Sequence, residues 1–99
     1  MRLTPPQILA IRNIVQLVAS AHKTVRVFGS RLDDAARGGD LDLLVEFTAP
    51  VENPALLAAQ ISAKISRVMH GRKVDVLLSA PNLLHLPIHD IAFQEGQVL

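Results

Sequence analysis

Two patterns of apolar positions alternate along this chain. Where apolar residues stand three or four positions apart, they mark one side of an amphipathic helix. This spacing predicts long helices over residues 4–22 and 54–70 and a shorter one over about 87–95, ending at Gly96. The residues expected to face the core are Ile8, Ile11, Val15 and Val18 in the first helix, Leu57, Ile61, Ile65 and Val68 in the second, and Ile88, Ile91 and Ala92 in the third.

Thr4 and Asn53 are the predicted caps at the start of the two long helices. Their side-chain oxygens can accept a hydrogen bond from a backbone N–H of the first turn. Pro5 and Pro54 follow them, and proline suits the first helical position because its missing N–H would have no partner there. Both helices therefore have a defined beginning.

Short runs of β-branched and aliphatic residues predict strands. These runs cover residues 24–28, 40–47 and 73–78. A short helix or helical turn is expected from Ser30 to Arg37. The order of elements is typical of an α+β domain with a small three-stranded or slightly larger mixed sheet. The second long helix crosses over between strands two and three.

Composition narrows the class of protein. The 99 residues contain no repeat or linker, which predicts one domain over residues 1–99. The chain has no cysteine, so disulfides, thiol catalysis and cysteine-ligated zinc are excluded. A formal charge of +1 does not indicate a nucleic-acid surface, and no direct DNA binding is expected. No stretch approaches ~20 apolar residues and no signal peptide is evident, so we expect a cytoplasmic protein without membrane contact.

The second predicted strand carries two carboxylates in an apolar run. Asp40 and Asp42 alternate with Leu41 and Leu43, and residues two apart project from the same face of a strand. Two like charges beside a core are unfavourable unless a cation or hydrogen-bond donors compensate them. Mg²⁺ binds carboxylates together with water and nucleotide phosphates, and it would compensate both.

A third carboxylate, Asp75, lies in the third predicted strand. If that strand lies beside the second, three acidic groups converge and a two-metal site for phosphoryl or nucleotidyl transfer becomes possible. Taken alone, Asp40 and Asp42 also suit an exposed edge strand with polar residues on one side. Their coincidence with Asp75 and with a Gly-Ser turn favours the metal site.

Gly29 and Ser30 follow the first strand and form a candidate phosphate cradle. Gly29 lets the backbone approach a phosphate closely, and the Ser30 hydroxyl can donate to its oxygens. Arg31 either reaches a phosphate or pairs with a neighbouring aspartate at the surface. Lys73 is expected at a helix end and strand entry rather than at a triphosphate.

His85 and His89 have a spacing that could suit a metal site, but their surroundings do not. The two histidines are four residues apart, but Pro87 lies between them and no glutamate stands beside either in a zinc-protease pattern. No zinc site is expected there.

These motifs jointly resemble those of the nucleotidyltransferase superfamily that includes DNA polymerase beta, and in particular its minimal nucleotidyltransferase (MNT) branch. The resemblance covers most of the chain and rests on Gly29-Ser30-Arg31, Gly39-Asp40-Leu41-Asp42-Leu43 and Val74-Asp75-Val76. It implies a nucleotidyltransferase fold. Gly39 stands where a serine often precedes the first aspartate, and the segment before it is slightly shorter than in many relatives; both are expected to tune the turn.

The resemblance also implies roles for these residues. Gly29 and Ser30, with Arg31, would hold the triphosphate of ATP. Asp40 and Asp42 would bind two Mg²⁺ ions, while Asp75 binds metal or activates the acceptor. The chain runs only 24 residues beyond Asp75 without a domain that grips an acceptor, so the acceptor surface is expected from another molecule.

Stand-alone MNT proteins are commonly antitoxins paired with a HEPN-domain ribonuclease toxin. The resemblance therefore implies transfer of AMP from ATP to a tyrosine of that toxin, within a hetero-oligomer. Two alternatives to this transfer stay open. In the first, the chain masks the toxin sterically without catalysis. In the second, it modifies a small molecule or an RNA.

Overall fold

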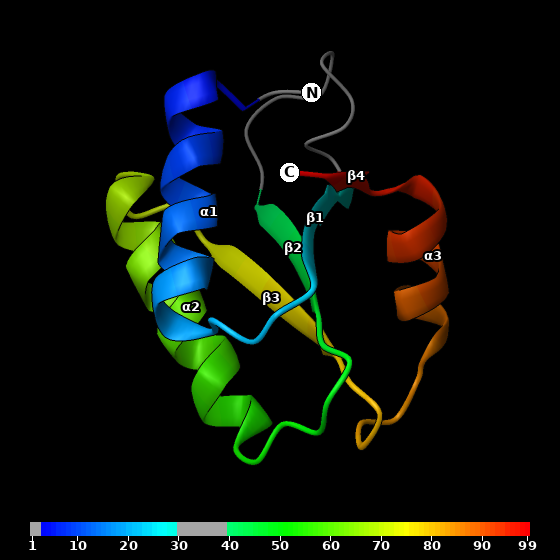
Figure 1. Cartoon of the computed structure of the whole chain (residues 1–99). Helices are drawn as coiled ribbons and strands as arrows, with labels where there is room; N and C mark the ends of the chain where they lie inside the picture. Colours follow the sequence, from blue (N-terminus) through cyan, green and yellow to red (C-terminus); the bar gives the residue numbers. More distant parts are fainter. Residues whose placement is uncertain (1–2, 30–39) are drawn as a thin grey trace.

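A four-stranded mixed sheet lies between helices in the computed structural model, which describes residues 3–29 and 40–99. Helices α1 and α2 cover one face of the sheet and α3 covers the other (Figure 1). The strand order is β3-β2-β1-β4. The elements are α1 (Pro5–Val18), β1 (Thr24–Phe28), β2 (Leu41–Glu46), α2 (Pro54–Val68), β3 (Val74–Ser79), α3 (Pro87–Glu95) and β4 (Gln97–Val98).

The predicted crossover of α2 between β2 and β3 is confirmed, since these two strands pair in parallel. Strand β1 pairs antiparallel with β2 on one side and with β4 on the other. The α+β class is confirmed and the sheet is one strand larger than the three predicted runs. Strand β4 has only two residues, too few for a recognisable alternation. The short helix expected from Ser30 to Arg37 lies outside the described residues.

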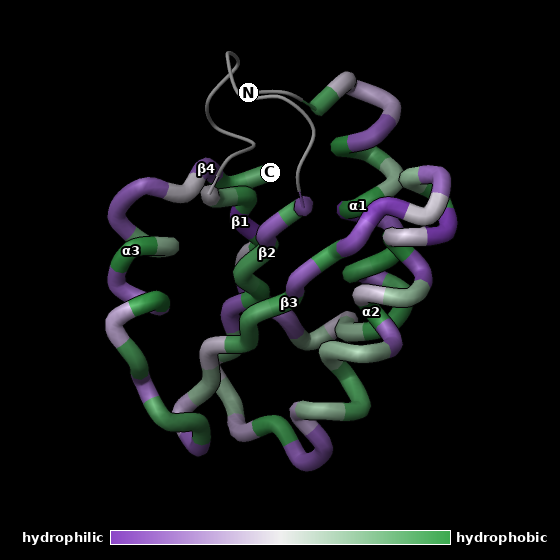
Figure 2. Tube along the Cα trace, turned by 180° about the vertical axis from the view of Figure 1, so that it is seen from behind, coloured by the Kyte–Doolittle hydropathy of each residue, from purple (hydrophilic) through white to green (hydrophobic). Residues whose placement is uncertain are grey.

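The odd and even positions of β2 face different layers. Leu41, Leu43 and Val45 are fully buried in the larger core, between the sheet and helices α1 and α2. The next residue on the opposite face, Leu44, joins a smaller cluster with Phe28 and Ala92 under α3. Figure 2 shows the apolar positions concentrated along the central strands and on the inner sides of the helices. Strands β1, β2 and β3 therefore contribute to two cores of unequal size.

The core-facing residues of the long helices are predicted well except at the end of α2. Ile11 and Val15 of α1 and Ile61 and Ile65 of α2 are fully buried. The prediction for Val68 is wrong, because its side chain is 47% exposed and Met69 takes the buried position instead. The helix ends at Val68, and the chain then turns through residues of positive φ, so the helical spacing no longer applies.

In α3 the predicted inner face is wrong at two of its three positions. Ile88 and Ile91 are exposed, whereas His89 and Ala92 are buried. The helix is thus rotated by about one residue from the orientation that its aliphatic residues suggest. The physical reason is that His89 finds hydrogen-bond partners inside the fold, so a polar ring takes a core position.

Of the two predicted caps, one is confirmed. The Gln7 N–H donates to Thr4 Oγ1 at 3.3 Å, and the Thr4 N–H donates to Gln7 Oε1 at 2.9 Å, which completes a capping box. The Asn53 side chain makes no capping hydrogen bond, and its ψ of 72° lies outside the extended region that caps usually adopt. At α2 only the Asn53 carbonyl accepts, from the Leu57 N–H at 2.9 Å.

Both long helices end earlier than the sequence predicts. Helix α1 stops at Val18, where the backbone and the ring Nδ1 of His22 both donate to the carbonyl of Ala19. After α2, His70 and Gly71 have φ values of 60° and 80°, and the Gly71 N–H donates to the Ser66 carbonyl. Local polar contacts therefore close each helix before its apolar pattern ends. Within the described residues, no helix has both the length and the apolarity to cross a bilayer.

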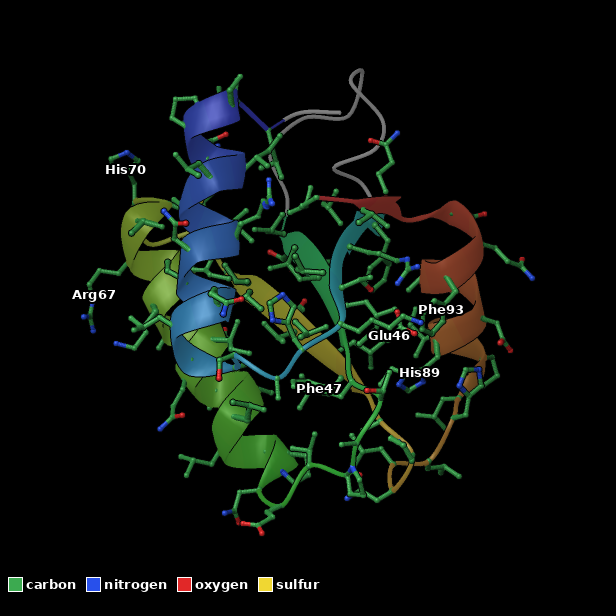
Figure 3. The ribbon with its side chains drawn as sticks, viewed as in Figure 1. Glu46, Phe47, Arg67, His70, His89 and Phe93 are labelled. Atoms are coloured by element: carbon green, nitrogen blue, oxygen red, sulfur yellow. The ribbon has the colours of Figure 1, made fainter. Side chains whose placement is uncertain are left out.

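Arg26 links α3 to the sheet through an ion pair with Glu46 of β2 and a cation–π contact with Phe93 of α3. The Arg26 guanidinium lies 3.0 Å from Glu46 and 4.7 Å from the centre of the Phe93 ring. Figure 3 shows Glu46 and Phe93 facing one another between the sheet and α3. Burial alone would raise the pKa of Glu46, but hydrogen bonds from Thr24 and Arg26 outweigh it and hold the pKa below its ordinary value.

His89 fixes the start of α3 against the end of β3. Its Nδ1 accepts from the Leu86 N–H at 3.0 Å, and its Nε2 donates to the Leu78 carbonyl at 2.9 Å. These partners define the neutral ring with the proton on Nε2. Both nitrogens are used within the fold. The neighbouring His85 stacks on this ring with the centroids 5.1 Å apart and is bonded to Asp90 at the surface.

We predict that His89→Phe lowers the free energy of unfolding by about 2–4 kcal/mol, because it leaves the buried Leu78 carbonyl and the partly buried Leu86 N–H without partners. The matched control is His85→Phe, whose ring is exposed and should cost less than about 1 kcal/mol. Urea unfolding followed by circular dichroism measures both. Equal losses in the two variants would contradict the role assigned to His89.

Candidate functional site

The register of the sheet places two of the three predicted carboxylates opposite each other. Asp42 of β2 pairs with Asp75 of β3 on one side and with Phe28 of β1 on the other. Asp40 immediately precedes β2, two residues from Asp42 and on the same face by strand alternation. The prediction that β3 lies beside β2 is therefore confirmed. The acidic side chains belong to the sheet face that α3 covers further along.

The backbone of Gly29 packs directly against the Asp42 carboxylate. Its φ of 74° lies in the left-handed region, and a β-carbon added there would collide with Asp42 Oδ2. Glycine thus serves both the turn that follows β1 and the close approach of backbone to carboxylate. Ser30 and Arg31, the other two predicted phosphate ligands, lie outside the described residues.

Lys73 lies at the entry of β3, as the sequence predicts, but its contact with the aspartates was not predicted. Its Nζ lies 3.7 Å from Asp40 Oδ2 and 3.9 Å from Asp75 Oδ1. The sequence favoured a basic helix end and strand entry over a contact with a triphosphate. The signal that would have found it is its spacing of two from Asp75, since that spacing puts both side chains on the same face of an extended segment.

Burial, together with repulsion from Asp75 and Asp40, raises the pKa of Asp42 above its ordinary value. Lys73 acts in the opposite direction and offsets part of this effect. Asp40 and Asp75 are therefore close enough to oppose the ionisation of Asp42. A cation at this edge of the sheet would relieve that repulsion.

The residues fit a divalent cation by their donor chemistry. In the described ranges 3–29 and 40–99, no group of three or more acidic or histidine side chains is placed so that it could hold a metal ion by itself. Mg²⁺ does not require three protein ligands, because it usually takes one or two carboxylates and fills its other positions with water and phosphate. The Lys73 ammonium already stands between Asp40 and Asp75, which shows that a positive charge can be accommodated at that point.

The site is an open edge rather than a deep cleft. Asp40 and Asp75 have side chains about half exposed, at 47% and 53%. Clefts elsewhere in the described part of the chain include a space of about 350 Å³ between α1 and the start of β1, and one of about 330 Å³ at the start of α2. Neither is lined by Gly29 or the three aspartates, and we assign the candidate chemistry to the exposed carboxylates.

We predict that Gly29→Ala destabilises the protein by about 2–3 kcal/mol, because it combines left-handed backbone strain with the collision against Asp42. Gly71→Ala is the matched control. Its φ is also positive, but no atom lies within 4 Å of the added β-carbon, so its cost should be limited to about 1 kcal/mol of strain. Equal costs in denaturant unfolding would show that the Asp42 contact is unimportant.

We predict that Asp42→Asn raises the midpoint of thermal unfolding at pH 7 by roughly 2–4 °C. A raised pKa means that the folded state holds the Asp42 proton more tightly than the unfolded chain, so ionisation at neutral pH weakens the fold. The gain should shrink as the pH falls through the raised pKa. It should vanish below about pH 4, where Asp42 is protonated in both states.

Glu46→Gln, on the same face of β2, is the contrasting variant. The pKa of Glu46 is lowered, so its ionised form stabilises the fold above its ordinary pKa, and that contribution disappears as the pH falls through the lowered value. Glu46→Gln should therefore lower the midpoint at pH 7. Calorimetry from pH 3 to 7 tests both, and shifts of the same sign would contradict the electrostatic explanation.

No protein family model matches the sequence, and no curated protein is significantly similar to it. Solved structures do share its architecture. The toxin-antitoxin with AMP-PNP superposes with a TM-score of 0.69 at 15% identity, over 97% of this chain and 72% of that chain. A variant of the toxin-antitoxin MntA-HpeT with two aspartate-to-glutamate substitutions gives 0.69 at 14% identity, over 97% and 71%.

A second MntA-HpeT variant, with a tyrosine-to-alanine substitution, gives a TM-score of 0.66 at 15% identity, over 98% of this chain and 71% of that chain. Such low identity establishes the fold and nothing finer. The chain has the α+β nucleotidyltransferase fold, as its motifs predict.

Proposed function

We propose that this chain is a minimal nucleotidyltransferase that acts as the antitoxin of a toxin–antitoxin pair. It transfers AMP from ATP to a tyrosine of a partner HEPN ribonuclease toxin and so neutralises it. The observation that carries the proposal is the placement of Asp42 between Asp75 and the Gly29 turn, with Asp40 two residues away. Because the chain has the nucleotidyltransferase fold, we interpret this arrangement as a metal site for nucleotidyl transfer.

The structural neighbours support the choice of partner and nucleotide. They are toxin–antitoxin proteins, and one contains AMP-PNP, an analogue of ATP. In one MntA-HpeT variant the two substituted aspartates stand two positions apart, the same spacing as Asp40 and Asp42. In another, a tyrosine of that pair was replaced by alanine. These features suit a carboxylate pair that binds metal and a tyrosine that accepts AMP.

Each residue of the site has a proposed role. Asp40 and Asp42, with Asp75, would hold one or two Mg²⁺ ions. Bound Mg²⁺ would supply neutralisation of phosphate charge and activation of the attacking oxygen. Gly29 leaves its backbone open to a phosphate group, since it carries no side chain. Ser30 and Arg31 are proposed from the sequence as further phosphate contacts.

The transfer itself requires a proton acceptor and an open approach. The tyrosyl oxygen attacks the α-phosphorus, the bond to the pyrophosphate group breaks, and the phenolic proton passes to a carboxylate, for which we propose Asp75. This carboxylate is half exposed and belongs to β3, an outer strand of the sheet. An acceptor residue on another protein can therefore reach it without entering a pocket. A cytoplasmic complex of the two chains is the expected setting.

Steric masking of the toxin without catalysis is the second candidate. The observation that favours it is the number of large apolar side chains at the surface of the helices, including Leu9 and Leu17 of α1 and Leu84 before α3. Such side chains can bind a partner with or without nucleotide chemistry. Modification of a small molecule or an RNA has no supporting observation in the described residues.

The decisive experiment is intact-mass analysis of the chain produced with the protein encoded beside it, before and after ATP and Mg²⁺. We expect the partner to gain the mass of one AMP. Asp42→Asn should slow this gain by more than about a hundredfold, because even the loss of groups that only support a metal ligand costs 10–100-fold.

Size-exclusion chromatography of the same samples separates catalysis from binding. Asp42→Asn should still form the complex, since Asp42 belongs to the site and not to the apolar helix surface. Steric masking would be established instead by two results together. The wild type would form a stable complex without a change in mass, and wild type and Asp42→Asn would neutralise the toxin equally well.

A further inference from the structure

The backbone holds Lys73 beside the carboxylate cluster, which consists of Asp40, Asp42 and Asp75. The Leu41 N–H donates to the Lys73 carbonyl at 3.0 Å, immediately before the two strands begin their parallel pairing. This hydrogen bond fixes the backbone of Lys73 beside Leu41, the residue that follows Asp40. Because Lys73 and Asp75 are two residues apart, the lysine side chain extends along the face that carries the carboxylates.

The contacts of Lys73 are ionic without being tight. Its Nζ stands 3.7 and 3.9 Å from the nearest oxygens of Asp40 and Asp75, longer than a charge-assisted hydrogen bond, and its side chain is 69% exposed. A pair of this kind forms and breaks at low cost. The ammonium therefore balances charge at the site while its flexible stem leaves it free to move away.

The balance of charge at the cluster is incomplete. One ammonium serves three carboxylates, and it lies within 4 Å of only two of them, Asp40 and Asp75. A divalent cation would compensate the cluster better, but it would occupy the region where the ammonium now stands. Two cations a few ångströms apart repel each other, so both cannot keep this position.

We propose that the Lys73 ammonium is the resident counter-ion of the carboxylate cluster and that a divalent cation must displace it, so that Lys73 sets the metal affinity of the site. This inference rests on the proposed function, because it takes the three aspartates as the metal site. Lys73 is a positioning residue here. In the metal-free protein its ammonium lies between Asp40 and Asp75, and it turns outward when the metal binds.

The test measures metal binding directly, without nucleotide or partner. Mn²⁺ serves as the probe, and the electron paramagnetic resonance signal of free Mn²⁺ gives the dissociation constant. Lys73→Met should bind Mn²⁺ about three- to tenfold more tightly than the wild type at low salt, because a competing charge is removed. The difference should narrow as the ionic strength rises. Lys73→Arg, which keeps the charge, should remain within about twofold of the wild type.

Lys23→Met is the matched control for the change in net charge. Lys23 is also exposed, and its Nζ lies 3.9 Å from one carboxylate, that of Glu46. Glu46 pairs with Thr24 at one end of β1, whereas Asp42 pairs with Phe28 at the other end, roughly 13 Å away along the strand. Lys23→Met should leave Mn²⁺ affinity unchanged. Thermal unfolding of every variant confirms that each is folded at the temperature of the assay.

The outcomes separate this inference from the proposed function. Equal or weaker Mn²⁺ binding by Lys73→Met, with binding abolished in Asp42→Asn, would overturn the role of Lys73 and leave the metal site intact. If Asp42→Asn binds Mn²⁺ as well as the wild type, the metal site itself is wrong. Absence of binding in every variant, the wild type included, would overturn both.

Discussion

The parallel pairing of β2 with β3 forces two carboxylates of like charge into neighbouring positions, and the rest of the structure is consistent with this constraint. Asp42 and Asp75 are register partners, and the backbone hydrogen bonds of the two strands prevent them from separating. The repulsion is tolerated because the opposite face of β2 is fully buried. Apolar burial there stabilises the strand while its polar face carries an unfavourable charge distribution.

The same face of β2 changes character along its length. Asp42 lies at the open end, Leu44 packs under α3 in the middle, and Glu46 is ion-paired with Arg26 at the far end. One strand thus contains a partly compensated acid and a fully compensated one. The difference arises from their neighbours. Glu46 has Thr24 and Arg26 beside it, whereas Asp42 has two other carboxylates, whose effect Lys73 offsets only in part.

Much of the fold follows from local patterns that the sequence displays openly. The bounds of β1 and α3, the capping of α1 by Thr4 and the order of the crossover need only periodicity and helix-end chemistry. The adjacency of β2 and β3 also followed, because a single helix between two strands favours a parallel pair. The candidate carboxylates can therefore be identified from the sequence alone.

The features that could not be predicted depend on partners distant in the sequence. His89 takes a core position because the Leu78 carbonyl lies within reach of its ring, and no hydrophobicity pattern encodes that contact. Lys73 approaches Asp40 only once β2 and β3 are paired. The aliphatic character of Ile88 and Ile91 predicts that they face inward, but both are exposed, because aliphatic character alone cannot fix the rotation of a short helix. Such tertiary contacts override local propensity.

The unequal size of the two cores has a consequence for motion. Helix α3 is held by the small cluster of Phe28, Leu44 and Ala92, while α1 and α2 share the larger one. Less apolar area opposes its detachment, so we expect the segment from α3 to β4 to open first, with backbone amides that exchange with solvent before those of β2. Leu44 is two residues from Asp42 on the same face. Each such opening would let water in beside that carboxylate, so the local dielectric of the candidate site would fluctuate with the docking of a helix that carries none of its residues.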